Sequence, residues 1–172
     1  MKDLLIIDGY NFIFNFFKAG NISSSQIEEI KGKLVTDLAA YNSQKDYEVI
    51  VVFDAHKGSN IERSSNVYDD IEVIHSRSGE TADSVIEEFV SRWSPDRRIV
   101  VVTSDYSQQK VVFGKNTTRR SSREFGLELE AVRNDITGMV DKEKKKTKKA
   151  FYPIEKRIDS KTRKKISDLR KK

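Results

Sequence analysis

Three short apolar runs in this chain each lead into an aspartate. The runs are LLII, VIVVF and IVVV, and they are followed by Asp8, by Asp54 and, after Thr103 and Ser104, by Asp105. Apolar runs without polar alternation are typical of strands buried on both faces of a parallel sheet. The carboxyl ends of such strands lie at one edge of the sheet, so we expect the acids to converge there. Clustered carboxylates repel one another unless a cation lies among them, and the pattern therefore predicts a divalent-metal site.

Helical patterns separate these runs. Strands are predicted at 3–8, 48–54, 71–75 and 98–104, and helices are predicted from 10–18, from a Ser25–Glu28 capping box, over Thr81–Trp93 and over Ser122–Val140. Residues 55–69 are predicted to be an exposed loop, and 105–113 a helix start. Alternating strands and helices predict βαβ units, and hence a three-layer α/β/α sandwich with a central, mostly parallel sheet.

The charge of the chain is unevenly distributed. Residues 1–135 hold 17 basic and 22 acidic side chains, whereas residues 136–172 hold 15 basic and 5 acidic ones. We therefore expect a domain over 1–140 and a basic, partly helical or flexible extension over 141–172. The extension favours a polyanionic partner such as RNA, or is a solubilising tail.

Composition excludes several other classes of protein. The chain has no cysteine, so it forms neither disulfides nor thiolate zinc sites. No stretch approaches the roughly 20 apolar residues of a membrane span, which predicts a cytoplasmic protein with no membrane contact. The chain also lacks the glycine-rich motifs of common ATP and dinucleotide sites.

The candidate metal ligands are Asp8, Asp83 and Asp105. Each also has a structural interpretation: Asp8 as a helix cap, Asp83 as a first-turn acid, and Asp105 as a partner of Gln108 in a capping box. Their placement at one sheet edge favours a shared site for Mg²⁺ or Mn²⁺, which prefer oxygen ligands. Asn11, Asp54, Glu80 and Ser104 are candidate supporting residues, although Asp54 also fits a turn and Glu80 a solvated position.

Candidate substrate contacts flank these acids. Arg119, Arg120 and Ser121 belong to a basic, hydroxyl-rich cluster before the last core helix, which suits a phosphate or is a solvated helix start. Tyr10, beside Asp8, is a candidate for stacking on a base. The two histidines, His56 and His75, are not predicted to contact substrate.

The combined motifs resemble a known family. IIDGYNFIF, VVFDA, GETADSVIE, VVTSDYSQQ and RRSSREF occur in the order found in YacP-like NYN-domain ribonucleases, relatives of the PIN-domain nucleases. The resemblance runs from Met1 to about residue 140. It implies an α/β/α sandwich and endonucleolytic cleavage of RNA at a divalent-metal site of aspartates. The family includes a bacterial endoribonuclease that acts on mRNA in association with translating ribosomes.

Carried over by motif, the resemblance assigns the metal to Asp8, Asp83 and Asp105, with Asn11 and Glu80 in support. The expected activity is hydrolysis of RNA by a metal-activated water, which leaves a 5′-phosphate and a 3′-hydroxyl. Two alternatives stay open: a non-catalytic RNA- or ribosome-binding module on the same fold, and a small-molecule phosphohydrolase.

Overall fold

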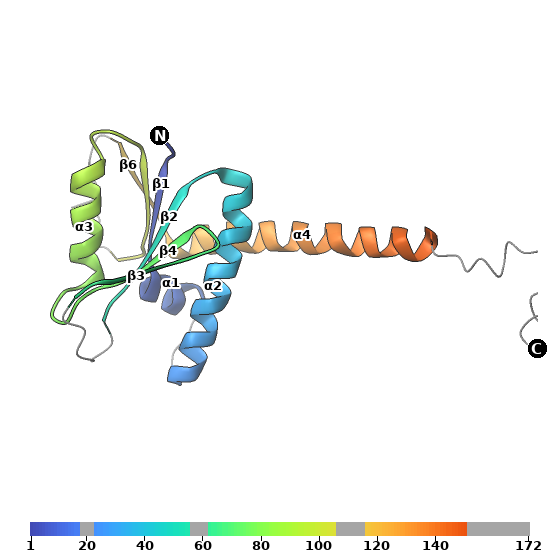
Figure 1. Cartoon of the computed structure of the whole chain (residues 1–172), viewed down its shortest axis with the longest axis horizontal. Helices are drawn as coiled ribbons and strands as arrows, with labels where there is room; N and C mark the ends of the chain where they lie inside the picture. Colours follow the sequence, from blue (N-terminus) through green and yellow to red (C-terminus); the bar gives the residue numbers. More distant parts are fainter. Residues whose placement is uncertain (18–22, 56–61, 106–115, 151–172) are drawn as a thin grey trace, which may run out of the picture. The chain divides into compact units, whose positions relative to one another are not determined.

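The computed structural model describes residues 1–17, 23–55, 62–105 and 116–150. A six-stranded sheet in the order β3-β4-β2-β1-β5-β6 forms its centre (Figure 1). Every strand pair is parallel except β3–β4. The elements are β1 (Leu4–Asp8), α1 (Gly9–Phe16), α2 (Ser24–Lys45), β2 (Glu48–Phe53), β3 (Ser64–Tyr68), β4 (Ile71–His75), α3 (Ala82–Trp93), β5 (Ile99–Val102), β6 (Thr117–Arg120) and α4 (Ser122–Ala150).

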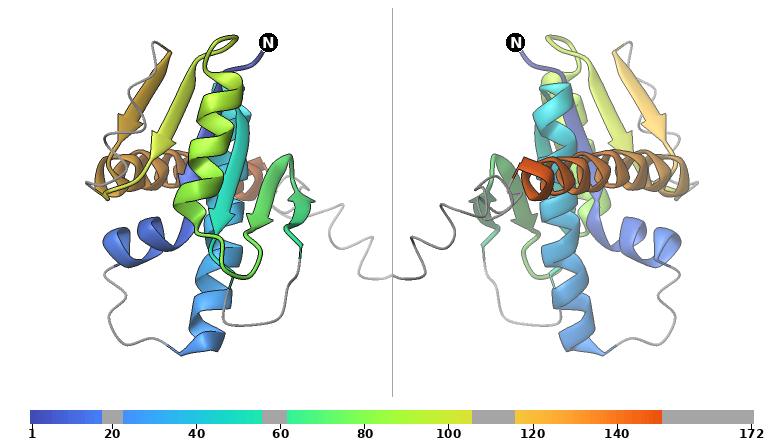
Figure 2. Two further views of the ribbon diagram at one scale, coloured as in Figure 1. Left: turned by 90° about the vertical axis from the view of Figure 1, so that its left-hand side faces the viewer. Right: turned by 90° about the vertical axis from the view of Figure 1, so that its right-hand side faces the viewer.

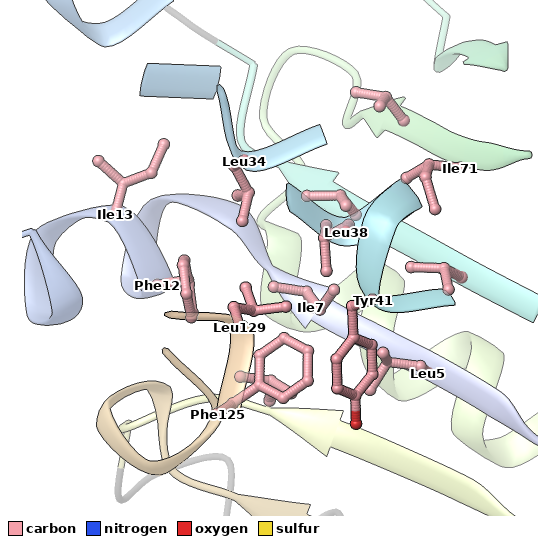
Figure 3. Packing of buried hydrophobic residues seen from close by; sticks show 14 of the residues in the cluster. Leu5, Ile7, Phe12, Ile13, Leu34, Leu38, Tyr41, Ile71, Phe125 and Leu129 are labelled. Carbon is pink, nitrogen blue, oxygen red and sulfur yellow. The ribbon is translucent and has the colours of Figure 1, made fainter. Parts of the chain in front are cut away.

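Helices cover both faces of the sheet, which confirms the predicted α/β class with a mostly parallel central sheet. Helix α3 lies on one face, and α1 and α2 lie on the other (Figure 2). The α3-side core includes sheet residues Leu4, Ile6, Ile50, Val52, Ile74, Ile99 and Val101. The α2-side core includes Leu5, Ile7, Val49, Val51, Phe53, Ile71, Val73, Val100 and Val102, together with Phe125 and Leu129 of α4 (Figure 3). Successive strand residues therefore alternate between the two cores, as the two-residue period of a strand requires.

The chain divides into two compact units, Met1–Arg133 and Asn134–Lys172. The sheet and both cores belong to the first unit. In the second unit, the described residues 134–150 are helical and continue α4. None of the described helices is long and apolar enough to cross a membrane.

The structure corrects two local predictions. The capping box of α2 is formed by Ser23 and Gln26, not by Ser25 and Glu28: Ser23 Oγ accepts from the Gln26 N–H, and Gln26 Oε1 accepts from the Ser23 N–H at 2.9 Å. Each pair has the same three-residue spacing, so spacing alone does not choose between them.

The predicted helix start at 105–113 lies almost entirely outside the described residues.

The second correction concerns residues 55–69, predicted to be a loop, which contain the edge strand β3. This strand pairs antiparallel with β4, and the two are joined by Asp69 and Asp70, both at positive φ (49° and 63°). A two-residue turn with both φ values positive is the type I′ hairpin connection, which tolerates aspartate. The polar sequence SSNVY lacks the apolar pattern of a buried strand. An edge strand can form without that pattern, because it gains its backbone hydrogen bonds on one side without being buried.

Candidate active site at the carboxyl edge of the sheet

Asp8 ends the central strand β1 and is only 7% exposed. It lies opposite Val52 of the α3-side core, so its side chain belongs to the α3 face of the sheet. Its Oδ1 accepts the N–H of Asn11 at 3.1 Å and thereby caps α1. The capping interpretation of Asp8 is thus confirmed, but it does not exclude a ligand role, because an ionised carboxylate offers about four lone-pair sites.

Asn11 connects three elements at this edge. Its Oδ1 accepts the N–H of Ser104 at 2.8 Å and the hydroxyl of Ser122 at 2.9 Å. The Ser122 N–H in turn donates to Ser104 Oγ at 3.1 Å. These bonds hold the end of β5 against the starts of α1 and α4. Asn11 and Ser104 are therefore positioning residues for Asp105, which follows Ser104.

Asp105 follows β5 by three residues and is half-buried. Its N–H donates to Thr103 Oγ1 at 3.1 Å, and Thr103 is fully buried. Strands β1 and β5 are adjacent and parallel, with Ile7 opposite Val102. Asp8 and Asp105 therefore lie at or just beyond the carboxyl ends of neighbouring strands, as predicted. The proposed capping partner Gln108 lies outside the described residues.

Asp83 occupies the first turn of α3 and is half-buried. Its neighbour Ala82 belongs to the α3-side core, together with Ile6 of β1 and Val52 of β2. Asp54 Oδ1 accepts the Ala82 N–H, so the acid after β2 fixes the start of α3. The structure thus assigns Asp54 a capping bond and brings Asp83 to the α3 face on which Asp8 lies.

Glu80, which was predicted to support the metal site, forms an ion pair with Arg63 instead. Its carboxylate accepts two hydrogen bonds from Arg63, from Nε at 2.8 Å and from Nη2 at 2.6 Å. Arg63 Nη2 also reaches Glu88 of α3 at 2.5 Å. The hydrogen bonds from Arg63 outweigh desolvation and lower the pKa of Glu80 to about 2. Arg63, just before β3, therefore forms ion pairs both with Glu80 and with Glu88 of α3.

This ion pair predicts a pH-dependent contribution to stability. The pKa of Glu80 is about 2 in the folded protein and 4.5 in the unfolded reference, so the contribution is complete above about pH 5 and falls as the pH approaches 2. We expect Glu80→Gln to lower the free energy of unfolding at pH 7, and the difference from wild type to shrink steadily between pH 5 and pH 2. Urea unfolding at a series of pH values measures this, with Glu72→Gln, on the outer hairpin, as the matched control. A difference that does not change with pH would contradict the assignment.

The two arginines of β6 lie on opposite faces of the sheet. Arg119 is opposite Val101 of the α3-side core, and its Nε donates to the Thr103 carbonyl at 3.0 Å. Arg120 is opposite Val102 of the α2-side core, and its Nη1 bonds both carboxylate oxygens of Glu128 at 2.9 and 2.7 Å. The structure therefore brings Arg119, and not Arg120, to the face of Asp8.

The remaining two candidate substrate residues make local contacts. Ser121 Oγ donates to Glu124 Oε2 at 2.8 Å and accepts the Glu124 N–H at 3.2 Å, which stabilises the first turn of α4. The ring of Tyr10 packs against Phe53, with centroids 5.2 Å apart, and against Phe14 at 6.0 Å. Tyr10 therefore lies on the α2 side of the edge.

The donor set at this edge has the chemistry of a site for a hard cation. Among the residues that the structure describes, no group of three or more histidine, cysteine, aspartate or glutamate side chains has the geometry to hold a metal ion. Magnesium usually takes one or two protein carboxylates and keeps several waters. The carboxylates of Asp8 and Asp105, at the ends of adjacent strands, match that hydrated mode of binding better than an all-protein cage.

Sequence reasoning missed the buried hydroxyls that hold this edge together. Ser76, fully buried after β4, donates its N–H to the Phe53 carbonyl at 2.9 Å and its hydroxyl to the Glu80 carbonyl at 2.8 Å, and accepts from Ala55 N–H at 2.9 Å. Thr103 and Ser122 have equivalent roles at β5 and α4. Of these three, only Thr103 directly follows an apolar run, and that position is the available signal, because the short side chain bonds nearby backbone groups.

Comparisons with known proteins add a family match and two kinds of relative. The sequence profile described as "YacP-like NYN domain" matches residues 5–171. A Bacillus subtilis (strain 168) protein, "Uncharacterized protein YacP", is 35% identical over 141 residues, which are 81% of this chain and 82% of that protein. The crystal structure of "Rae1 (YacP)" from Bacillus subtilis superposes with a TM-score of 0.70 at 30% identity and covers 98% of this chain and 95% of that one. The crystal structure of a single-substitution mutant of Rae1 superposes with a TM-score of 0.66 at 34% identity, covering 81% and 82%.

Proposed function

Because this chain belongs to the YacP-like NYN family, a family of nuclease-type fold, we propose that it is a divalent-metal-dependent endoribonuclease. The observation that supports the proposal is that Asp8 and Asp105 lie at the carboxyl ends of adjacent parallel strands. Asp8 ends β1, Asp105 follows the adjacent β5, and Asp83 lies in the first turn of the helix that covers the same face. Open parallel sheets bind their ligands at this edge.

In the proposed reaction, Asp8, Asp83 and Asp105 hold the cation directly or through its waters. A bound Mg²⁺ or Mn²⁺ would lower the pKa of a water molecule and offset charge on the scissile phosphate. Asn11 and Ser104 keep the Asp105 segment in place through their mutual hydrogen bond of 2.8 Å. In this proposal Arg119, on the same face, binds a neighbouring phosphate. In-line attack by water then leaves a 5′-phosphate and a 3′-hydroxyl.

The experiment for this function uses a 3′-labelled single-stranded RNA that begins with a 5′-hydroxyl, with Mn²⁺, with Mg²⁺ and with EDTA. We expect cleavage with either cation, none with EDTA, and products that a 5′-phosphate-dependent exonuclease degrades. RNA binding without cleavage under every condition, with and without ribosomes, would favour the alternative of a non-catalytic binding module. Hydrolysis of nucleotides or sugar phosphates with the RNA intact would favour a small-molecule phosphohydrolase.

We further propose that mRNA, presented by the ribosome, is the substrate and that the basic extension contributes to binding. All 15 basic residues of the last 37 positions lie at or after Lys142. Contacts between such residues and phosphates release counterions, so affinity falls steeply with salt.

Deleting residues 141–172 should therefore weaken binding to RNA and to ribosomes at low salt and flatten the dependence of log Kd on log[salt]. Fluorescence polarisation and ribosome co-sedimentation at several salt concentrations measure the two effects. A variant in which the deleted segment is replaced by an uncharged Gly/Ser segment of equal length controls for chain length. Identical affinity of the truncated and intact chains at every salt concentration would rule out this role.

A further inference from the structure

A pocket of about 370 Å³ lies between α2 and the strands β2, β4 and β3. Its lining includes Lys31 and Gly32 of α2, Phe53 of β2, Tyr68 of β3, and Val73 and His75 of β4. Small-molecule sites in proteins begin at about 300 Å³ and combine apolar walls with a few polar groups. This pocket matches that description, and it lies on the α2 face of the sheet, away from Asp8.

Aromatic rings form the end of the pocket nearest the carboxyl edge of the sheet. Phe53 and His75 end β2 and β4 opposite each other, and their rings stack with centroids 5.6 Å apart at an angle of 23°. Tyr10 meets the same Phe53 ring edge-on at 5.2 Å. Because Phe53 is only 1% exposed, the half-buried ring of His75 is the more accessible part of this stack at the end of the pocket.

Lys31 adds a fixed cation beside these rings. Its side chain is 11% exposed, and its Nζ lies 4.7 Å from the Phe53 centroid, 5.1 Å from the Tyr10 centroid and 2.8 Å from Glu28 Oε1. Burial lowers the pKa of Lys31, but its hydrogen bond to Glu28 and its electrostatic interactions with Tyr10 and Glu28 outweigh burial and raise the pKa above its ordinary value. A donor and an acceptor thus lie side by side, which is the hydrogen-bonding pattern that the polar edge of a nucleobase requires.

The pocket and the candidate active site share two short segments of chain. Tyr10 follows Asp8 by two residues, and Phe53 directly precedes Asp54. An RNA strand with its scissile phosphate at Asp8 would cross the carboxyl end of the sheet, past Tyr10, to bring a base to His75. RNA-binding proteins commonly hold unstacked bases against aromatic side chains in this way.

We propose that this pocket binds one unstacked base of the single-stranded RNA substrate, on the face of the sheet opposite the scissile phosphate. The base stacks on the ring of His75, which the buried Phe53 supports from its other face, and its polar edge meets Lys31 and Glu28. This inference rests on the proposed function, because it takes RNA as the ligand. It gives the active site a means to select the nucleotide at one position.

Gly32 offers a way to fill the pocket without disturbing the fold. No heavy atom lies within 4 Å of the position where a Cβ on Gly32 would stand, so a side chain there extends into open space. Replacing a glycine inside a helix also favours the helix. Gly32→Leu therefore blocks the pocket, and Gly32→Ala is the matched control that leaves most of it open.

The test measures binding, without divalent cation, of a fluorescein-labelled RNA hexamer containing all four bases. We expect Gly32→Leu and His75→Ala to weaken binding by at least about fivefold, the lower limit for loss of one stacked base, and Gly32→Ala to bind as wild type does. The loss should persist at high salt, because stacking is not screened as phosphate contacts are. Equal affinities of wild type, Gly32→Leu and His75→Ala, with melting temperatures that show folded proteins, would overturn the proposal.

A parallel cleavage assay separates failure of this inference from failure of the proposed function. If wild type cleaves RNA and Gly32→Leu binds and cleaves equally well, the pocket assignment is wrong and the nuclease assignment stands. If Gly32→Leu weakens binding but wild type cleaves nothing with any cation, the pocket assignment stands and the nuclease assignment is wrong.

Discussion

Asp8→Asn should lower the rate of metal-dependent RNA cleavage by at least about 10³-fold while leaving the protein folded. The substitution removes the charge that would hold a cation at the end of β1. It keeps an oxygen to accept the N–H of Asn11, and asparagine caps a helix about as well as aspartate does. The loss should therefore appear in activity and not in stability. Single-turnover cleavage of labelled RNA at saturating Mn²⁺, together with thermal unfolding, measures both.

Asp70→Asn is the matched control, because it is the same chemical change at the opposite end of the sheet. Asp70 precedes β4 and has φ of 63°, a conformation that asparagine tolerates. The Asp70→Asn protein should cleave RNA at the wild-type rate. Asp8→Ala should lose the same activity and also about 1 kcal/mol of stability, because alanine cannot cap α1. An unchanged rate for Asp8→Asn would remove Asp8 from the catalytic site.

Gly9→Ala should destabilise the protein by about 1–3 kcal/mol. A Cβ on Gly9 would meet the ring of Phe53, and the three nearest ring carbons lie between 2.3 and 2.7 Å from its position. Phe53 is 1% exposed and is packed by Tyr10 and His75, so its ring has little room to move. The chain after Asp8 thus requires a glycine in order to place α1 against β2. Equilibrium unfolding in urea measures the change.

The matched control is Gly32→Ala, which adds the same methyl group to α2 in open space. It should stabilise the protein by up to about 1 kcal/mol, because alanine favours the helix over glycine. Opposite signs for the two variants would show that close packing, and not glycine content in general, decides the outcome. A Gly9→Ala protein as stable as wild type would contradict the packing described here.

The buried strands could be predicted because each has a strong local signal, whereas the role of the three acids as metal ligands stays a prediction. Apolar runs identify β1, β2 and β5, and the parallel topology then places Asp8 and Asp105 at one edge. The edge strand β3 could not be predicted in this way, since its stability comes from pairing with β4 and not from burial of its own residues. The turn between β3 and β4 has positive φ values at Asp69 and Asp70. Aspartate is a weaker sequence signal for such a turn than glycine is.

The ion-pair partners of the polar residues were the least predictable property of the candidate site. Glu80 and Arg120 have residue types that suit a metal or a phosphate, yet they form ion pairs with Arg63 and Glu128. Arg63 lies 17 residues before Glu80, and nothing in the local sequence of either residue indicates the other. Arg119 and Arg120 are adjacent in sequence, and only the strand register separates them onto opposite faces. Long-range pairing therefore decides which polar residues remain for chemistry.

Anomalous diffraction from crystals of the protein soaked in Mn²⁺ tests most directly whether strand-end carboxylates hold a cation. We predict a peak at about 2.0–2.3 Å from a carboxylate oxygen of Asp8 or Asp105, with Asp83 bound directly or through a water. The peak should disappear in Asp8→Asn crystals treated in the same way. A protein that cleaves RNA with Mn²⁺ but shows no peak at this edge, or shows one elsewhere, would contradict the account.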